Sequence, residues 1–367
     1  MNIDGHLVLS DRVMPGRIMF DQTIADVRPL SHVPDRYILP GFIDGHVHGG
    51  GGADTMDGVD AIRHMALFHM AHGTTTLLPT TITAPWSDIM DALYAVADVM
   101  RTGIHGGPSI PGAHLEGPFI NPHKLGAQPP FTQVPGPARM TAVLRSGAVK
   151  VVTLAPEIEH ADAAIQAFVN AGIRVNIGHT LADHDQTERA ICLVCGPGGT
   201  VGGTHLFNAM PPIAARAPGP ATALMCSDVA YAEMVFDTHH VHPALFRLAY
   251  RLMGSRLVFV TDSMRATGAG DGPSTLGGQD VVVSDGVARL ADDTLAGSVL
   301  TLDQALRNAL QAGVSLPQAA ALVSTHAANW LGLHDRGALL PGRRADMVVL
   351  GPDLTVQEVW VEGRRRA

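Results

Sequence analysis

The sequence predicts an α/β protein: a (β/α)8 barrel with a small β-sandwich domain formed from both chain ends. Three observations support this fold class. Short apolar segments alternate along the chain with helix-like stretches rich in Ala, Leu and Met. Both ends contain strand-like pieces without a convincing helix. The turn after the first strand also lacks the GxGxxG pattern of an open doubly wound sheet, so a closed barrel is the better interpretation.

The barrel is expected to span residues 39–335. Its strands are expected at 41–48, 74–79, 110–116, 151–155, 174–179, 204–207, 233–238 and 257–262. Amphipathic helices at 59–72 and 86–100 separate the first strands, an alternation typical of a TIM-like barrel. A β-like insertion at 277–290 follows the eighth strand.

The β-sandwich is expected to combine residues 1–38 with residues 336–367. Strand-like pieces occur at 6–10, 17–20, 24–27, 345–350 and 356–361. Neither end is long enough to bury a core alone, so we expect the two to pair beside the barrel.

Composition narrows the function classes. Among 367 residues, 16% are charged and the formal net charge is −9, which leaves no electrostatic footprint for nucleic acid. Three cysteines and no long apolar span predict a cytoplasmic protein with no membrane partner. Cys192 and Cys195 have CxxC spacing, but no second CxxC completes a zinc site and the pair lies in a predicted helix.

The first strand ends in His46-Val47-His48, followed by four glycines. Side chains repeat every second residue along a strand, so both imidazoles leave it on one face. Two neutral imidazoles placed this way can share a divalent metal ion. An alternative interpretation is a polar turn with two hydrated histidines. The residues at the other strand ends distinguish a metal site from such a turn.

Those ends carry Glu116, His179, His205 and Asp262. Singly, each has an ordinary structural explanation, such as a hydrogen-bonded histidine or an N-capping aspartate. Five strands placing His, Glu or Asp at the same end predict a metal site, because barrel chemistry occurs at the carboxyl ends of the strands. Such a site holds one or two divalent ions, Zn or Fe in the first place and Mn or Co as alternatives.

Metal-assisted hydrolysis is the expected chemistry. A divalent ion can lower the pKa of a bound water and polarise a carbonyl, and Asp262 is the natural general acid/base. The sequence has no GxSxG and no cysteine placed as a nucleophile, so acyl-enzyme catalysis is not expected.

These residues resemble the amidohydrolase superfamily, and within it the N-acetylglucosamine-6-phosphate deacetylase family. The resemblance spans PGFIDGHVH at 40–48, HGTT at 72–75, HLEGPF at 114–119, GH at 178–179, HLFNAM at 205–210 and TD at 261–262. It implies hydrolysis of a linear amide C–N bond in a phosphorylated amino sugar. It also implies that Glu116, His179 and His205 hold the principal ion. His46 and His48, which some members lack, would hold a second ion shared with Glu116 and Asp262.

The resemblance further implies a set of substrate contacts and a homodimer. Asn208, the Ala209 backbone N–H and His240 correspond to sugar and phosphate contacts of the family. Arg216 offers a planar fork suited to a phosphate. Either Arg216 or His242 is expected to reach a partner subunit's substrate.

Gln128 is a departure, because many members have a histidine at this position that polarises the scissile carbonyl. An amide carries no charge, so we expect polarisation to shift toward the second ion held by His46 and His48.

Two alternatives remain. One is another amide hydrolase of the superfamily, dihydroorotase-like or D-aminoacylase-like; those commonly use a bridging lysine on the fourth strand, which has no interior lysine here. The other is a barrel that serves as a non-catalytic scaffold, although such barrels usually lose ligands.

Overall fold

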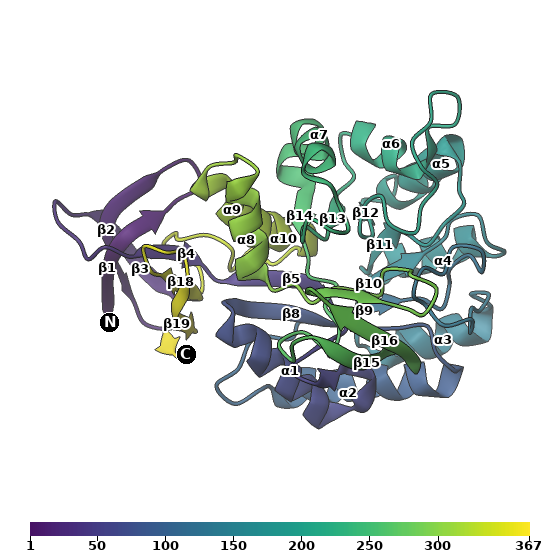
Figure 1. Cartoon of the computed structure of the whole chain (residues 1–367), viewed down its shortest axis with the longest axis horizontal. Coiled ribbons are helices and arrows are strands. Elements are labelled where there is room, and N and C mark those ends of the chain that lie inside the picture. Colours follow the sequence, from purple (N-terminus) through teal and green to yellow (C-terminus); the bar gives the residue numbers. More distant parts are fainter.

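Eight short parallel strands form the wall of the barrel in the computed structural model, which describes residues 1–367 (Figure 1). They are β5 (Phe42–Val47), β8 (Thr74–Thr81), β9 (Ala113–Glu116), β10 (Val149–Leu154), β11 (Arg174–Ile177), β12 (Val201–Gly203), β13 (Ala232–Met234) and β14 (Leu257–Phe259). The (β/α)8 prediction is confirmed. Most of these residues are buried on both faces, as expected for parallel strands between a packed interior and a layer of helices.

Backbone hydrogen bonds close the barrel at the two places where neighbouring strands do not belong to one continuous sheet. One sheet has the order β12-β11-β10-β9-β8-β5, and β13 pairs with β14. Between β12 and β13, Gly203 N donates to Tyr231 O at 2.9 Å and Leu206 N donates to Glu233 O at 2.8 Å. At the other seam, His48 N donates to Ser263 O at 3.0 Å.

The helices cover the outside of this wall. They are α1 (Val59–Ala71), α2 (Trp86–Thr102), α3 (Pro137–Ser146), α4 (Ala161–Asn170), α5 (His184–Cys195), α6 (Gly219–Cys226), α7 (Pro243–Met253), α8 (Leu302–Gln311), α9 (Leu316–Val323) and α10 (Thr325–Leu331). Helix α5 begins at a capping box between Asp183 and Gln186, and helix α2 buries Ile89, Leu93 and Val96 on one face. None of the ten is long and apolar enough to cross a membrane.

The sixth strand lies earlier than predicted. It ends at Gly203, and the expected strand at 204–207 is instead a tight turn. His205, Phe207 and Ala209 have φ values of 30°, 81° and 51°. A strand cannot accommodate this left-handed backbone, so the apolar pattern at 204–207 reflects a buried turn.

Both chain ends join one seven-stranded sheet, in the order β20-β19-β18-β4-β1-β2-β3. Its strands are β1 (Asn2–Val8), β2 (Val13–Phe20), β3 (Ile24–Pro29), β4 (Tyr37–Pro40), β18 (Met347–Leu350), β19 (Val356–Val361) and β20 (Arg364–Arg365). Its own core contains ten buried residues, among them Ile18, Ile38 and Met347. The predicted pairing of the ends is therefore confirmed, with hydrogen bonds linking all seven strands in a single sheet; Figure 1 shows both termini there.

The predicted insertion forms a small antiparallel sheet of β15 (Gly272–Leu276), β16 (Gln279–Ser284) and β17 (Val287–Arg289). Leu276, Val281 and Val283 pack against Ile82, just beyond β8, and against Met264. The remaining short elements are β6 (Gly49–Gly50), β7 (Ala53–Asp54), η1 (Thr55–Asp57) and η2 (Gly254–Arg256). The insertion thus covers one side of the barrel mouth.

Candidate active site

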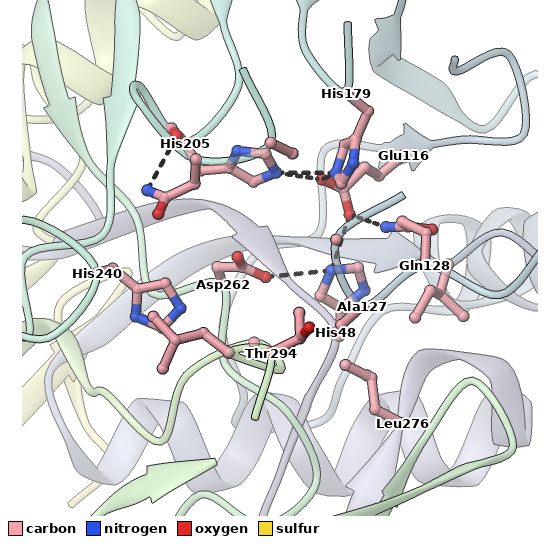
Figure 2. Close-up of a pocket in the computed structure, with 16 residues that line it drawn as sticks. His48, Glu116, Ala127, Gln128, His179, His205, His240, Asp262, Leu276 and Thr294 are labelled. Carbon is pink, nitrogen blue, oxygen red and sulfur yellow. Dashed lines mark hydrogen bonds and ion pairs between the residues drawn. The ribbon is translucent and has the colours of Figure 1, made fainter. Parts of the chain in front are cut away.

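The barrel's carboxyl end holds a cavity of about 210 Å³ that contains most of the predicted ligands (Figure 2). His48, Glu116, His179, His205 and Asp262 line it, and His46 lies buried directly behind His48. These side chains come from different strand ends, as the sequence predicted.

Glu116 lies between two groups of ligands. Its Oε1 is 3.1 Å from His179 Nε2 and 3.0 Å from His205 Nε2. Its Oε2 is 3.0 Å from His48 Nε2 and 3.4 Å from His46 Nε2. Each carboxylate oxygen therefore faces a different pair of imidazoles, which is the arrangement of a bridging carboxylate.

Asp262 completes the second group. Its Oδ1 lies 3.3 Å from His48 Nε2 and 3.5 Å from His46 Nε2. The two imidazole nitrogens are themselves 3.2 Å apart. We call His46, His48 and Asp262 the second ligand set, and Glu116, His179 and His205 the first.

The donor atoms fit a divalent metal ion. His179 Nδ1 lies 2.9 Å from the Lys124 carbonyl oxygen, which can only accept, so His179 donates there and its Nε2 is left as a bare lone pair. That lone pair faces His205 Nε2 at 3.0 Å. For a tetrahedral ion with bonds of roughly 2.0–2.1 Å, neighbouring ligand atoms are about 3.3 Å apart, close to the separations seen here.

The electrostatics also favour a cation. Burial disfavours charge on His46, but the carboxylates of Glu116, Asp262 and Glu233 outweigh it and raise its pKa well above the ordinary value. His48 has its pKa raised to about 9 in the same way, despite burial, by Asp262 and Glu116. Burial would raise the pKa of Glu116 and Asp262, yet the facing histidines hold both below their ordinary values. The buried carboxylates thus require positive charge beside them.

The backbone is strained at three of the ligands. His179, His205 and Asp262 have φ values of 48°, 30° and 51°, in the left-handed region that residues with a Cβ rarely adopt. Such strain typically persists where the surrounding structure imposes it for function. It turns each side chain from the strand end into the cavity.

Gln128 lies at the cavity edge, and both its amide nitrogen and its amide oxygen are hydrogen-bonded. Its Nε2 donates to Glu116 Oε2 at 2.7 Å, and its Oε1 accepts from Thr83 N at 2.7 Å. The predicted substrate contact is therefore at the cavity, but its donor group serves the bridging carboxylate (Figure 2).

Asn208, Ala209 and His240 also line the cavity, as expected for substrate contacts. Asn208 Nδ2 donates to His205 O at 3.2 Å. His240 Nδ1 lies 2.6 Å from Asp237 Oδ2. Although burial alone would raise the pKa of Asp237, the His240 hydrogen bond lowers it, so the carboxylate holds the ring in one orientation.

A family model described as the amidohydrolase family matches residues 37–366. The chain is 37% identical over 355 residues to N-acetylgalactosamine-6-phosphate deacetylase of Escherichia coli O157:H7, covering 94% of this chain and 92% of that protein.

The chain belongs to the amidohydrolase family.

Other relatives agree with this membership. N-acetylglucosamine-6-phosphate deacetylase of Vibrio furnissii is 37% identical over 94% of this chain and 85% of its own length. A solved structure of N-acetyl-D-glucosamine-6-phosphate deacetylase from Mycobacterium smegmatis has a TM-score of 0.92 at 36% identity, covering 100% of both chains. D-aminoacylase, one of the alternatives, shares the fold alone, with 14% identity and a TM-score of 0.58.

Arg216 does not line the cavity of this amidohydrolase. It is exposed, in a turn where Ala214 and Ala217 form an isolated bridge. His242 is also exposed, and its Nδ1 accepts from Ala244 N at the start of α7. Within one chain, neither Arg216 nor His242 therefore lies at the cavity.

Sequence reasoning missed three contributors to the amidohydrolase site. Glu233 is buried on β13 behind His46, and Asp237 orients His240. Thr294, beyond the insertion strands, also lines the cavity. Glu233 could have been found from the sequence, since it is a carboxylate within the apolar run 232–236. An unpaired charge is costly to bury, so such a residue indicates a buried polar partner. Nothing in the sequence pattern pointed to Thr294.

Proposed function

We propose that this chain hydrolyses the acetamide of N-acetylglucosamine 6-phosphate, giving acetate and glucosamine 6-phosphate. The observation that carries the proposal is Glu116, whose two oxygens face two pairs of histidines while Asp262 lies beside them in the cavity. Relatives at 36–37% identity with this name and nearly full coverage support the choice of substrate.

Asp262 is the proposed acid/base. Facing His46 and His48, which lower its pKa despite burial, it is a carboxylate at neutral pH and can accept a proton. It takes the proton of the water whose oxygen attacks the acetamide carbonyl carbon. As the C–N bond breaks, Asp262 returns the proton to the leaving nitrogen, and acetate departs. A divalent ion in the ligand sets lowers the pKa of a bound water and polarises a carbonyl.

The remaining cavity residues bind and orient the sugar in this proposal. His240, fixed by Asp237, presents its other ring nitrogen to a hydroxyl or phosphate oxygen. The Asn208 side chain and the Ala209 backbone contribute polar groups from the turn that carries His205.

We further propose that the protein is a homodimer in which Arg216 binds the phosphate in the partner's cavity. Exposed leucines on α7, Leu245, Leu248 and Leu252, are spaced to share one face and are 39%, 44% and 48% exposed. An apolar stripe of this kind is typical of a subunit contact. Arg216 lies on an exposed turn just before α6, and no ion pair within the chain involves it.

Zn or Fe is the proposed metal, with Mn or Co as alternatives, and both ligand sets are proposed to bind an ion. Residues 39–335 are proposed as the catalytic unit, with 1–38 and 336–367 as the small domain. The three cysteines are free and the proposed substrate is a phosphate ester, and both features support a cytoplasmic location.

The test combines metal analysis of the purified protein with acetate release from N-acetylglucosamine with and without the 6-phosphate. We expect one or two divalent ions per chain and faster turnover of the phosphorylated sugar. No acetate release from either sugar would overturn the proposal, and equal rates would overturn the phosphate contacts.

N-acetylgalactosamine 6-phosphate is a second candidate substrate, because the Escherichia coli relative carries that name at the same 37% identity. The two sugars differ only at the 4-hydroxyl, so a comparison of kcat/KM for both decides between them. We expect the gluco sugar to be preferred.

A further inference from the structure

Glu233 connects three parts of the barrel beneath the metal ligands. It is 1% exposed on β13. Its Oε2 lies 2.9 Å from His46 Nδ1 and accepts from His205 N at 3.3 Å, while its Oε1 accepts from Asn176 Nδ2 at 2.8 Å. A buried carboxylate without these partners would be strongly destabilising, so its position is fixed by them.

Glu233 does not belong to a third metal site. His46, His114 and Glu233 place their ligand atoms within 4.8 Å of one another. However, His114 Nδ1 is 3.1 Å from the Gly45 carbonyl oxygen, and His114 Nε2 is 2.7 Å from Thr153 Oγ1. Both ring nitrogens are therefore engaged and none remains for an ion.

The contact with His46 sets the tautomer of that ring. In the neutral ring that would bind an ion, Nδ1 donates its hydrogen bond to Glu233, which leaves the Nε2 lone pair directed at His48 Nε2 and Asp262 Oδ1. The first ligand set receives different support: its His179 is oriented by the Lys124 carbonyl, and Glu233 reaches only the backbone of His205. Support from Glu233 thus favours the second set.

We propose that Glu233 is a positioning residue that makes binding of the second ion strong while leaving the first nearly independent of it. This inference rests on the two-ion centre of the proposed function. Partners that orient a metal-bound histidine typically contribute about 10- to 100-fold in metal affinity.

The experiment measures two metal dissociation constants per chain by competition with a chelator, for wild type, Glu233→Gln and Glu233→Leu. Glu233→Gln removes only the charge. Its carbonyl can still accept from His46, and its amino group can donate to Asn176 Oδ1, which has no partner, after rotation of the Asn176 amide. Glu233→Leu removes every hydrogen bond of the carboxylate.

We expect Glu233→Leu to weaken binding of the second ion by about 10- to 100-fold, and Glu233→Gln to weaken it by less. The affinity for the first ion should change by less than about threefold in both variants. The matched control is Thr153→Val. It removes the buried hydrogen bonds of the Thr153 hydroxyl to His114 and Thr204 in the same barrel interior, none of which involves a ligand side chain, and should leave both constants within about twofold.

Three results would overturn the inference: unchanged second-ion affinity in Glu233→Leu, equal weakening of both ions, or the same loss in Thr153→Val. If Glu233→Leu fails to fold, Glu233→Gln decides, and wild-type affinity in that variant overturns the inference. A wild-type protein that binds two ions but releases no acetate would instead contradict the proposed function.

Discussion

Gln128 donates its amide hydrogen to the same oxygen of Glu116 that faces His48 and His46, so one carboxylate oxygen is shared by an amide and the second ligand set. A neutral donor to a carboxylate is worth about 1.5–3 kcal/mol. The amide therefore holds the Glu116 carboxylate in its orientation. That polarisation depends on the second ion stays a prediction.

Gln128→Ala should weaken binding of the second ion by roughly tenfold, because Glu116 loses the hydrogen bond that orients its Oε2. The measurement is metal stoichiometry at fixed free metal, together with kcat. Gln133→Ala is the matched control, since the side chain of that half-buried glutamine donates only to the Phe131 carbonyl. Full second-ion occupancy in Gln128→Ala would contradict the assignment.

Asp262→Asn should lower kcat by about 10²- to 10⁴-fold, because an amide cannot accept the proton of the attacking water. Steady-state kinetics with metal analysis checks this. Asparagine tolerates the left-handed backbone at this position, where φ is 51°, so the substitution adds no strain. Asp285→Asn, at an exposed position with φ of 50°, is the control. A kcat within tenfold of wild type would exclude Asp262 as the acid/base.

His69 should make the protein lose stability as the pH falls from about 6.5 to about 4. Burial lowers the pKa of His69 from 6.5 to about 4, only partly offset by its hydrogen bond to Gly49 O. The unfolded chain therefore binds a proton that the folded chain does not, and stability rises with pH across this window by about 3 kcal/mol.

Denaturant unfolding of wild type and His69→Gln between pH 7 and pH 4 measures this contribution. Glutamine can donate to Gly49 O but does not titrate, so the difference between the two proteins isolates His69. Parallel pH profiles would show that His69 does not carry the effect.

Thr238→Gly should stabilise the protein by about 1 kcal/mol. Thr238 is an exposed β-branched residue with φ of 74°, a conformation that costs about 1–3 kcal/mol, offset partly by the larger chain entropy of glycine. Thr238→Ala retains the Cβ and its strain, so it should gain much less. Differential scanning calorimetry compares the three proteins. Equal melting temperatures would mean that the turn relaxes at no cost.

Mixing of two inactive variants tests the contribution of Arg216 to the partner's site. In a dimer of one Asp262→Asn chain and one Arg216→Ala chain, one site combines an intact Asp262 with an intact Arg216. After subunit exchange, random pairing should restore about a quarter of the wild-type rate on the phosphorylated sugar at low concentration. Activity no higher than the sum of the separate variants would place Arg216 in its own chain's site or outside both.

The sequence predicted the elements whose patterns are local and strong. The apolar runs ending in His48, Glu116 and His179 located three barrel strands, because burial on both faces makes such strands continuously apolar. The strand predicted at 204–207 is wrong, because a buried turn can be as apolar as a strand. Positive φ at His205 and Phe207 is imposed by tertiary contacts and leaves no signature in residue type.

Gln128 and Glu233 show a second limit. Pattern and resemblance placed Gln128 at the site. They did not show that its amide oxygen accepts a hydrogen bond from Thr83 N, 45 residues away in sequence. Glu233 meets His46 across 187 residues of sequence. Hydrogen bonds between distant segments depend on barrel closure, which periodicity does not encode.

The shared sheet of the two chain ends has a consequence for how the enzyme is made. Strand β4 pairs with β18 and, through Gly41 alone, continues into β5, which carries His46. During synthesis at about 5–20 residues per second, β18 emerges on the order of 15–60 seconds after β4. Strand β4, which leads directly into the segment that carries His46, is thus among the first translated, yet its partner β18 arrives nearly last. A nascent or truncated polypeptide that stops short of β18 would expose the edge of β4 and be a natural substrate for chaperones and proteases.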